Sequence, residues 1–159
     1  MTVIDLLDEG DRNLECWSNQ LPLDLPIKET IAPLSKKWNH VVWPSQIEIK
    51  VKELRIDHLA TLIVEPTSLE YEKLIRQYRD DVSEQLGVRA PNHLAYGLHI
   101  SLAYRTFDLE ESEWEVANVL VKKINQNLDK REIKFTLDEP EFCYFPDMSA
   151  FVKVDGNFF

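Results

Sequence analysis

The segment Gly97-Leu-His-Ile-Ser-Leu-Ala-Tyr-Arg105 decides the fold of this chain and the place of its chemistry. Apolar residues, Tyr104 among them, alternate with His99, Ser101 and Ala103, which predicts a strand with one buried face and Tyr104 pointing away from His99. Residues two apart on a strand share a face, so His99 and Ser101 lie side by side. An imidazole beside a hydroxyl can bind a phosphate and transfer protons at its oxygens. The pattern also suits a half-buried histidine with one hydrogen-bond partner, because such groups are often structural.

The elements on either side of this segment predict an α+β fold. Apolar alternation or continuous apolar runs indicate further strands, and apolar residues three and four apart indicate three helices. The expected strands are residues 2–7, 47–51, 59–64, 132–138, 141–145 and 149–154, and the expected helices are 27–38, 67–86 and 108–128. Strands and helices in this order predict antiparallel or mixed sheets with helices packed on the outside.

Local signals predict where the helices begin and end. Thr67 with Glu70, and Asp108 with a glutamate three residues on, have the spacing of a capping box. Gly87 follows the second helix, where a glycine commonly ends a helix. Pro33 lies within the first helical segment and predicts a broken or late-starting helix there.

Composition limits the possible functions. The 159 residues suffice for one domain with a sizeable core. A formal charge of −10, from 18 basic and 28 acidic residues, argues against a long nucleic-acid footprint but allows one phosphate in a local site. Two cysteines and no secretory signal favour a reducing cytoplasm, and no Cys/His spacing suggests a metal. No apolar run is long enough to cross a membrane.

The chain has three other histidines. His40 lies at the expected end of a helix, where a capping or surface role suits a cationic side chain. His58 begins an apolar run and lies an odd number of residues before Thr61, so the two would face opposite ways on a strand. His93 lies in a loop that leads to His99, and is either incidental or a functional loop residue.

The residues from Arg89 to Tyr104 also carry a resemblance to a known family. An Arg-x-Pro-x-His-x-x-Tyr segment precedes His99-Ile-Ser-Leu-Ala-Tyr104. This arrangement resembles the second motif of the two-histidine phosphoesterases, which include RNA 2′,3′-cyclic phosphodiesterases and RNA ligases of the 2′–5′ type. The resemblance implies one domain over residues 1–159, with two pseudo-symmetric lobes that share a central cleft. Each lobe of such a protein contributes one His-x-Thr/Ser motif on a strand.

The first motif of that family matches this chain only from Thr2 onward. Relatives carry His-x-Thr early in the chain, and the position two before Thr2 precedes Met1. An acidic turn, Arg12, Trp17 and the segment Leu21–Pro26 then follow in the order that the resemblance implies. We therefore expect the natural reading frame to extend upstream to a histidine, and a chain that starts at Met1 to have reduced or absent activity.

The resemblance also implies roles for individual residues. His99 would be one acid–base group, and the hydroxyls of Ser101 and Thr2 would bind phosphate oxygens. Weaker candidates for substrate contact are Arg89, His93, Tyr96 and Arg105. No cofactor is implied.

Three functions remain open at this point. One is a hydrolase acting on a cyclic phosphate of a nucleotide or RNA end. Another is a domain that holds a small phosphorylated ligand without turnover, and the third is a scaffold in which His99 is structural. The acidic composition favours a small ligand over long RNA.

Overall fold

A computed structural model describes residues 1–44, 46–146 and 150–154. The chain divides into two compact units, each assembled from three segments. The sheet unit comprises Met1–Val3, Gln46–Lys73 and Tyr96–Leu137, and the helix unit comprises Ile4–Ser45, Leu74–Ala95 and Asp138–Phe159.

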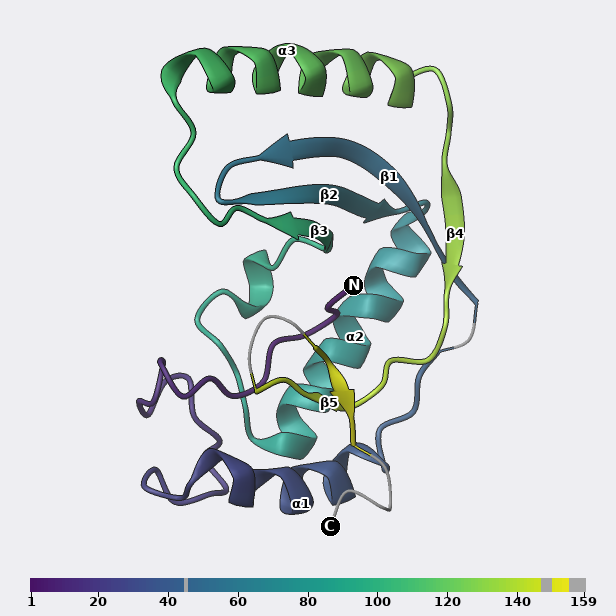
Figure 1. Ribbon diagram of the computed structural model, residues 1–159. Coiled ribbons are helices and arrows are strands. Elements are labelled where there is room, and N and C mark those ends of the chain that lie inside the picture. Colours follow the sequence, from purple (N-terminus) through teal and green to yellow (C-terminus); the bar gives the residue numbers. More distant parts are fainter. Residues whose placement is uncertain (45, 147–149, 155–159) are drawn as a thin grey trace. The chain divides into compact units, whose positions relative to one another are not determined.

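The sheet unit is built on a four-stranded antiparallel sheet in the order β3–β2–β1–β4 (Figure 1). Its strands are β1 Ile47–Ile56, β2 Leu59–Pro66, β3 His99–Tyr104 and β4 Lys134–Leu137. The strands predicted from the alternation at 47–51 and from the apolar run at 59–64 are thus confirmed, as is the strand that carries His99. Ile47 and Ile49 are fully buried, which makes β1 the centre of this unit's core.

Two irregularities in register shape this sheet. One lies in β1 between Val51 and Glu53, and the other lies where β3 pairs with Ala60 and Thr61 of β2. An extra residue in one strand increases the local twist and reverses which residues face each side. The prediction for Tyr104 is therefore wrong: it pairs with Leu59, two residues from Thr61, so the register puts it on the His99 face.

Helix α3, Glu111–Leu128, packs along β1 (Figure 1). It covers the part of the β1 edge that does not pair with β4. The Asn125 side chain accepts from the Leu54 N–H at 2.7 Å and donates to the Leu54 carbonyl at 3.0 Å. Both main-chain groups are thereby satisfied without a neighbouring strand.

The helix unit holds α1 Ile27–Trp38 and most of α2 Leu69–Leu86. It also contains a short 3₁₀ helix, His93–Ala95, and a two-stranded sheet of β5 Cys143–Tyr144 and β6 Val152–Lys153. Its aromatic core includes Trp43, whose ring lies 4.7 Å from that of Tyr78 in an edge-to-face contact. Burial raises the pKa of Tyr78 well above its usual range.

The structure corrects several local predictions. Residues 2–7 do not form a strand, because only Thr2 makes a ladder contact, a single bridge to His99. Pro33 lies inside an unbroken α1. The three predicted strands after residue 131 shorten to β4, β5 and β6, and the start of the last, at residue 149, lies outside the described residues.

The predicted helix caps are also shifted along the chain. Helix α2 is capped by Ser68, whose hydroxyl accepts from the Tyr71 N–H at 3.2 Å. The N-cap of helix α3 is Glu110, whose N–H donates to the Glu113 carboxylate at 2.8 Å. Gly87 does end α2 as predicted, with a φ of +66°. Among the described residues, no helix is both long and apolar enough to span a bilayer.

Candidate functional site

His99 begins β3 and lies between two neighbouring segments of the sheet unit. On one side it pairs with Ile63 of β2, and on the other it forms an antiparallel bridge with Thr2. Residues directly opposite in antiparallel pairing point to the same face. The structure therefore brings together three predicted site residues, Thr2, His99 and Ser101, on one face of the sheet.

The His99 ring is oriented by the main chain. Its Nδ1 lies 3.0 Å from the Gly97 carbonyl oxygen. A carbonyl only accepts hydrogen bonds, so Nδ1 carries a proton in this arrangement. In the neutral ring, Nε2 then presents a lone pair, which is the form that a general base needs.

Tyr96 lies next to this histidine. Its ring centroid is 5.9 Å from that of His99, with the two planes tilted by 42°. Its hydroxyl donates a long hydrogen bond of 3.5 Å to the Thr2 carbonyl. Tyr96 thus connects the segment before β3 to the N-terminal bridge and packs beside the imidazole.

Sequence reasoning missed two residues on the face that carries His99. Thr61 of β2 is opposite Ser101, and Arg55 of β1 is opposite Thr61. Three strands therefore place a hydroxyl, a second hydroxyl and a guanidinium in one row across the sheet. Thr61 is the one hydroxyl residue within the apolar run of residues 59–64, and this was the feature of the sequence that could have identified it. From the sequence alone, we compared Thr61 only with His58.

Arg105 is held away from this row. Its Nη2 lies 3.2 Å from an Asp108 carboxylate oxygen, and its guanidinium carbon is 5.2 Å from the Trp114 ring centre. Both contacts fix the side chain near the start of α3. These contacts place the Arg105 side chain near the start of α3, and its contact with substrate stays a prediction.

His93 and Arg89 belong to the helix unit, where both contact Asp80. The His93 ring is 6% exposed and its Nε2 lies 2.9 Å from an Asp80 oxygen. Arg89 Nη1 lies 3.1 Å from the same oxygen. Hydrogen bonding from His93, and secondarily from Arg89, lowers the pKa of Asp80 despite the opposing effect of burial. This geometry favours a structural His93 over the functional alternative.

The remaining two histidines lie outside the row as well. His40 is exposed just after α1, and its N–H donates to the Lys37 carbonyl at 3.0 Å. His58 lies in the turn between β1 and β2, and its ring pairs with Asp57 at 3.0 Å while remaining largely exposed. The position of His40 agrees with the capping or surface role expected for it, whereas His58 was expected to be structural and instead lies in an exposed turn.

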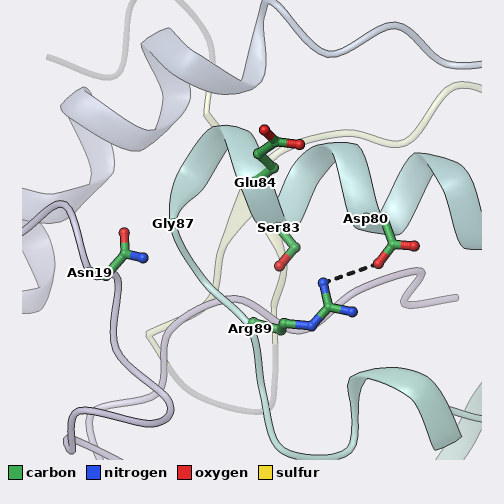
Figure 2. Close-up of a pocket in the computed structure, with 6 residues that line it drawn as sticks. All are labelled: Asn19, Asp80, Ser83, Glu84, Gly87 and Arg89. Carbon is green, nitrogen blue, oxygen red and sulfur yellow. Dashed lines mark ion pairs between the residues drawn. The ribbon is translucent and has the colours of Figure 1, made fainter.

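A pocket in the helix unit gives a second place to consider (Figure 2). Its volume is about 540 Å³, and it is lined by Asn19, Asp80, Ser83, Glu84, Gly87 and Arg89. The Arg89 guanidinium already faces Asp80, as the dashed line in Figure 2 marks. Two carboxylates against one guanidinium leave net negative charge, which repels a phosphate.

No group of three or more His, Cys, Asp or Glu side chains in the described ranges is placed to hold a metal ion. The face that carries His99 offers hydroxyls, an imidazole and a guanidinium, and these groups suit an anion better than a cation.

Residues 1–60 match the family model 2H-phosphodiest, described as a domain of unknown function (DUF1868). The match extends over less than half of the chain and makes its N-terminal part similar to the two-histidine phosphoesterases. It covers Thr2, Arg55 and all of β1, and thus half of the sheet's antiparallel hairpin.

A solved structure supports the fold of this chain. The crystal structure of the conserved protein of unknown function ATU0111 from Agrobacterium tumefaciens str. C58 matches with a TM-score of 0.82 at 23% identity. The match covers 96% of this chain and 64% of that protein, so this chain spans somewhat less than two thirds of its length. No curated protein matches the sequence.

Proposed function

We propose that this chain hydrolyses a cyclic phosphate or phosphodiester of a nucleotide or RNA end by histidine acid–base catalysis. One observation carries the proposal. His99 Nδ1 donates a hydrogen bond to the Gly97 carbonyl oxygen at 3.0 Å. His99 also shares its face of the sheet with the hydroxyl residues Thr2 and Ser101. A base held in one tautomer beside two hydroxyls matches what phosphate chemistry requires.

In the proposed reaction, water attacks the phosphorus of a 2′,3′-cyclic phosphate. His99 accepts a proton from this water as the new P–O bond forms. The bond between phosphorus and one ribose oxygen breaks, and that oxygen receives a proton from a second group. The product is a phosphomonoester beside a free hydroxyl. Each proton transfer contributes about 10²- to 10⁴-fold in rate.

The bridge between Thr2 and His99 suggests where that second group belongs. In an antiparallel pair, the residue two before a paired residue lies opposite the residue two after its partner. A residue two before Thr2 would therefore be opposite Ser101, on the same face as His99. A histidine there, as the family resemblance implies, would give two His-x-hydroxyl motifs related by an approximate twofold axis. Each imidazole would lie beside the hydroxyl of the other motif.

The acidic composition supports a small substrate. At a formal charge of −10, the chain would repel an extended phosphate backbone, whereas a single terminal phosphate needs only local donors. A mononucleotide 2′,3′-cyclic phosphate, or the cyclic phosphate at an RNA 3′ end, satisfies this condition. Tyr96 packs beside His99, and an aromatic ring at this place would suit a base in the substrate.

The test is hydrolysis of 2′,3′-cyclic AMP and 2′,3′-cyclic CMP, followed by phosphorus NMR. We expect the wild type to form a 2′- or 3′-monophosphate faster than a buffer blank, and His99→Ala to be slower by about 10²- to 10⁴-fold. Hydrolysis unaffected by His99→Ala would refute the proposal.

A second candidate is a domain that binds phosphate or nucleotide without turnover. It is favoured by the presence, among the described residues, of a single histidine on the face that carries Ser101. This alternative expects adenosine 2′-monophosphate to bind, its affinity to depend on His99, and cyclic AMP to remain intact. Affinity that does not depend on His99 would instead fit a scaffold with a structural histidine.

A further inference from the structure

The row formed by Ser101, Thr61 and Arg55 is more than an extension of the His99 motif. Three neighbouring strands supply one residue each, and each is directly opposite the next in the register. Opposite residues in antiparallel pairing have Cβ atoms about 5 Å apart. The two hydroxyls therefore lie within reach of two oxygens of a single phosphate.

Thr61 lies largely buried in β2 but keeps its hydroxyl accessible. The residue is 9% exposed, and its hydroxyl is not one of the fully buried polar side-chain atoms that lack a hydrogen-bond partner in the described part of the chain. A hydroxyl that reaches solvent can bond water or a ligand oxygen. The neighbour on one side, Ser101, is exposed, so a ligand can approach Thr61 from that side.

Arg55 retains hydrogen-bonding capacity on this face. Its Nε donates to Glu53 at 2.8 Å and its Nη2 donates to the same carboxylate oxygen. Its Nη1 donates to no residue that the structure describes. A guanidinium has five N–H donors in a fixed plane, so it can hold one carboxylate and still bind a phosphate oxygen.

We infer that Thr61 and Arg55 are substrate-binding residues that hold the non-bridging oxygens of the phosphate on which His99 acts. This inference rests on the proposed function and adds two residues outside both His-x-Thr/Ser motifs. Thr61 and Ser101 would each donate to one oxygen, and Arg55 would neutralise the charge from the far side of the row. Glu53 would then tune affinity, because it competes with the phosphate for the same guanidinium.

The experiment measures the affinity of the full chain for adenosine 2′-monophosphate by calorimetry in low salt. Thr61→Val keeps the shape and removes the hydroxyl, and we expect the Kd to rise about fivefold. Arg55→Gln should raise the Kd about tenfold. Glu53→Gln removes the competing carboxylate and should lower the Kd about two- to threefold.

Matched variants in the same unit serve as controls. Thr136→Val removes a hydroxyl from an exposed position on β4, and Arg131→Gln removes one positive charge from an exposed position after α3. Both should leave the Kd within about twofold of wild type. Thermal unfolding of every variant shows whether the fold is retained. If Thr61→Val unfolds, Arg55→Gln and Glu53→Gln, both at solvent-accessible positions, still decide the outcome.

The outcomes separate this inference from the proposed function. If His99→Ala abolishes hydrolysis of 2′,3′-cyclic AMP while Thr61→Val and Arg55→Gln bind adenosine 2′-monophosphate like the wild type, the inference is overturned and the proposed function stands. If both variants weaken binding but no hydrolysis occurs, the row is confirmed as a phosphate site and the hydrolase proposal fails. A wild type that does not bind the monophosphate overturns the inference.

Discussion

His93 and His99 lie six residues apart in the sequence, yet the structure gives them opposite surroundings. His93 is 6% exposed and its Nε2 faces the Asp80 carboxylate at 2.9 Å. His99 is partly exposed and its Nδ1 is held by the Gly97 carbonyl at 3.0 Å. A ring fixed at one nitrogen by the main chain keeps the other nitrogen for a ligand, whereas a buried ring on a carboxylate serves packing.

Within this short segment, the proposed chemistry belongs to His99, and a contribution to stability is expected of His93. The residues around His99 are hydroxyls and a guanidinium on a sheet face. His93 lies beside the Asp80 carboxylate of α2, which also pairs with Arg89. Arg79 of the same helix donates a hydrogen bond to the His93 carbonyl at 2.9 Å.

His99→Ala should abolish most of the chemistry and leave the fold intact. We expect the rate of 2′,3′-cyclic AMP hydrolysis to fall by about 10²- to 10⁴-fold, because one proton-transfer group is lost. The free energy of unfolding should change by less than about 0.5 kcal/mol, because the ring is partly exposed. Phosphorus NMR and urea unfolding of the same sample check both values. A strongly destabilised variant would argue for a structural His99.

His93→Ala should show the reverse pattern. It removes a buried ring with a carboxylate partner, so the free energy of unfolding should fall by about 2 kcal/mol. Hydrolysis per folded molecule should remain within about twofold of wild type. Urea unfolding and the turnover assay together check this prediction, and a loss of turnover comparable to that of His99→Ala would contradict it.

Two glycines before these histidines allow a matched test of backbone strain. At Gly87 the φ is +66°, and an added Cβ would lie 2.4 Å from an Asn19 side-chain oxygen. Gly87→Ala should cost about 1–2 kcal/mol from its left-handed backbone alone, before any clash. At Gly97 an added Cβ meets nothing within 4 Å, so Gly97→Ala should be nearly neutral. Thermal unfolding compares the two, and equal effects would contradict this account.

The Asp80 interaction should appear as a pH-dependent part of the stability. His93, and then Arg89, lower the pKa of Asp80, so its stabilising effect is present above the unfolded value near 3.9. That effect is lost as the pH falls through the lower folded value. Asp80→Asn should therefore cost about 1 kcal/mol at pH 6, screened because the side chain is 45% exposed. Urea unfolding at pH 6 and below pH 3 should show the difference disappear in acid; a constant difference would contradict it.

Local pattern in the sequence predicted much of the fold. Period-two alternation placed His99 and Ser101 on one face correctly, because both lie before the irregular pairing in β3. The same alternation failed at Tyr104, where the extra residue reverses the faces. It also failed for residues 2–7, where only Thr2 makes a ladder contact.

The wider site could not be predicted in the same way. Thr61 and Arg55 join Ser101 through the register of three strands, and register between distant segments is not a local property of the chain. The sequence alone suggested that Arg105 could contact a substrate. The structure shows that its side chain forms an ion pair with Asp108 and packs over the Trp114 ring. The burial of His93 depends likewise on contacts with Asp80 of α2.

The most direct test of the central claim is the response of the imidazole nitrogens to a phosphate ligand. Long-range ¹H–¹⁵N NMR spectra would be recorded while adenosine 2′-monophosphate is added, with His99→Ala and His93→Ala used for assignment. We predict that the Nε2 signal of His99 shifts with saturation while the His93 signals stay in place. Movement of His93 without His99, or saturable binding that leaves both unchanged, would contradict the account.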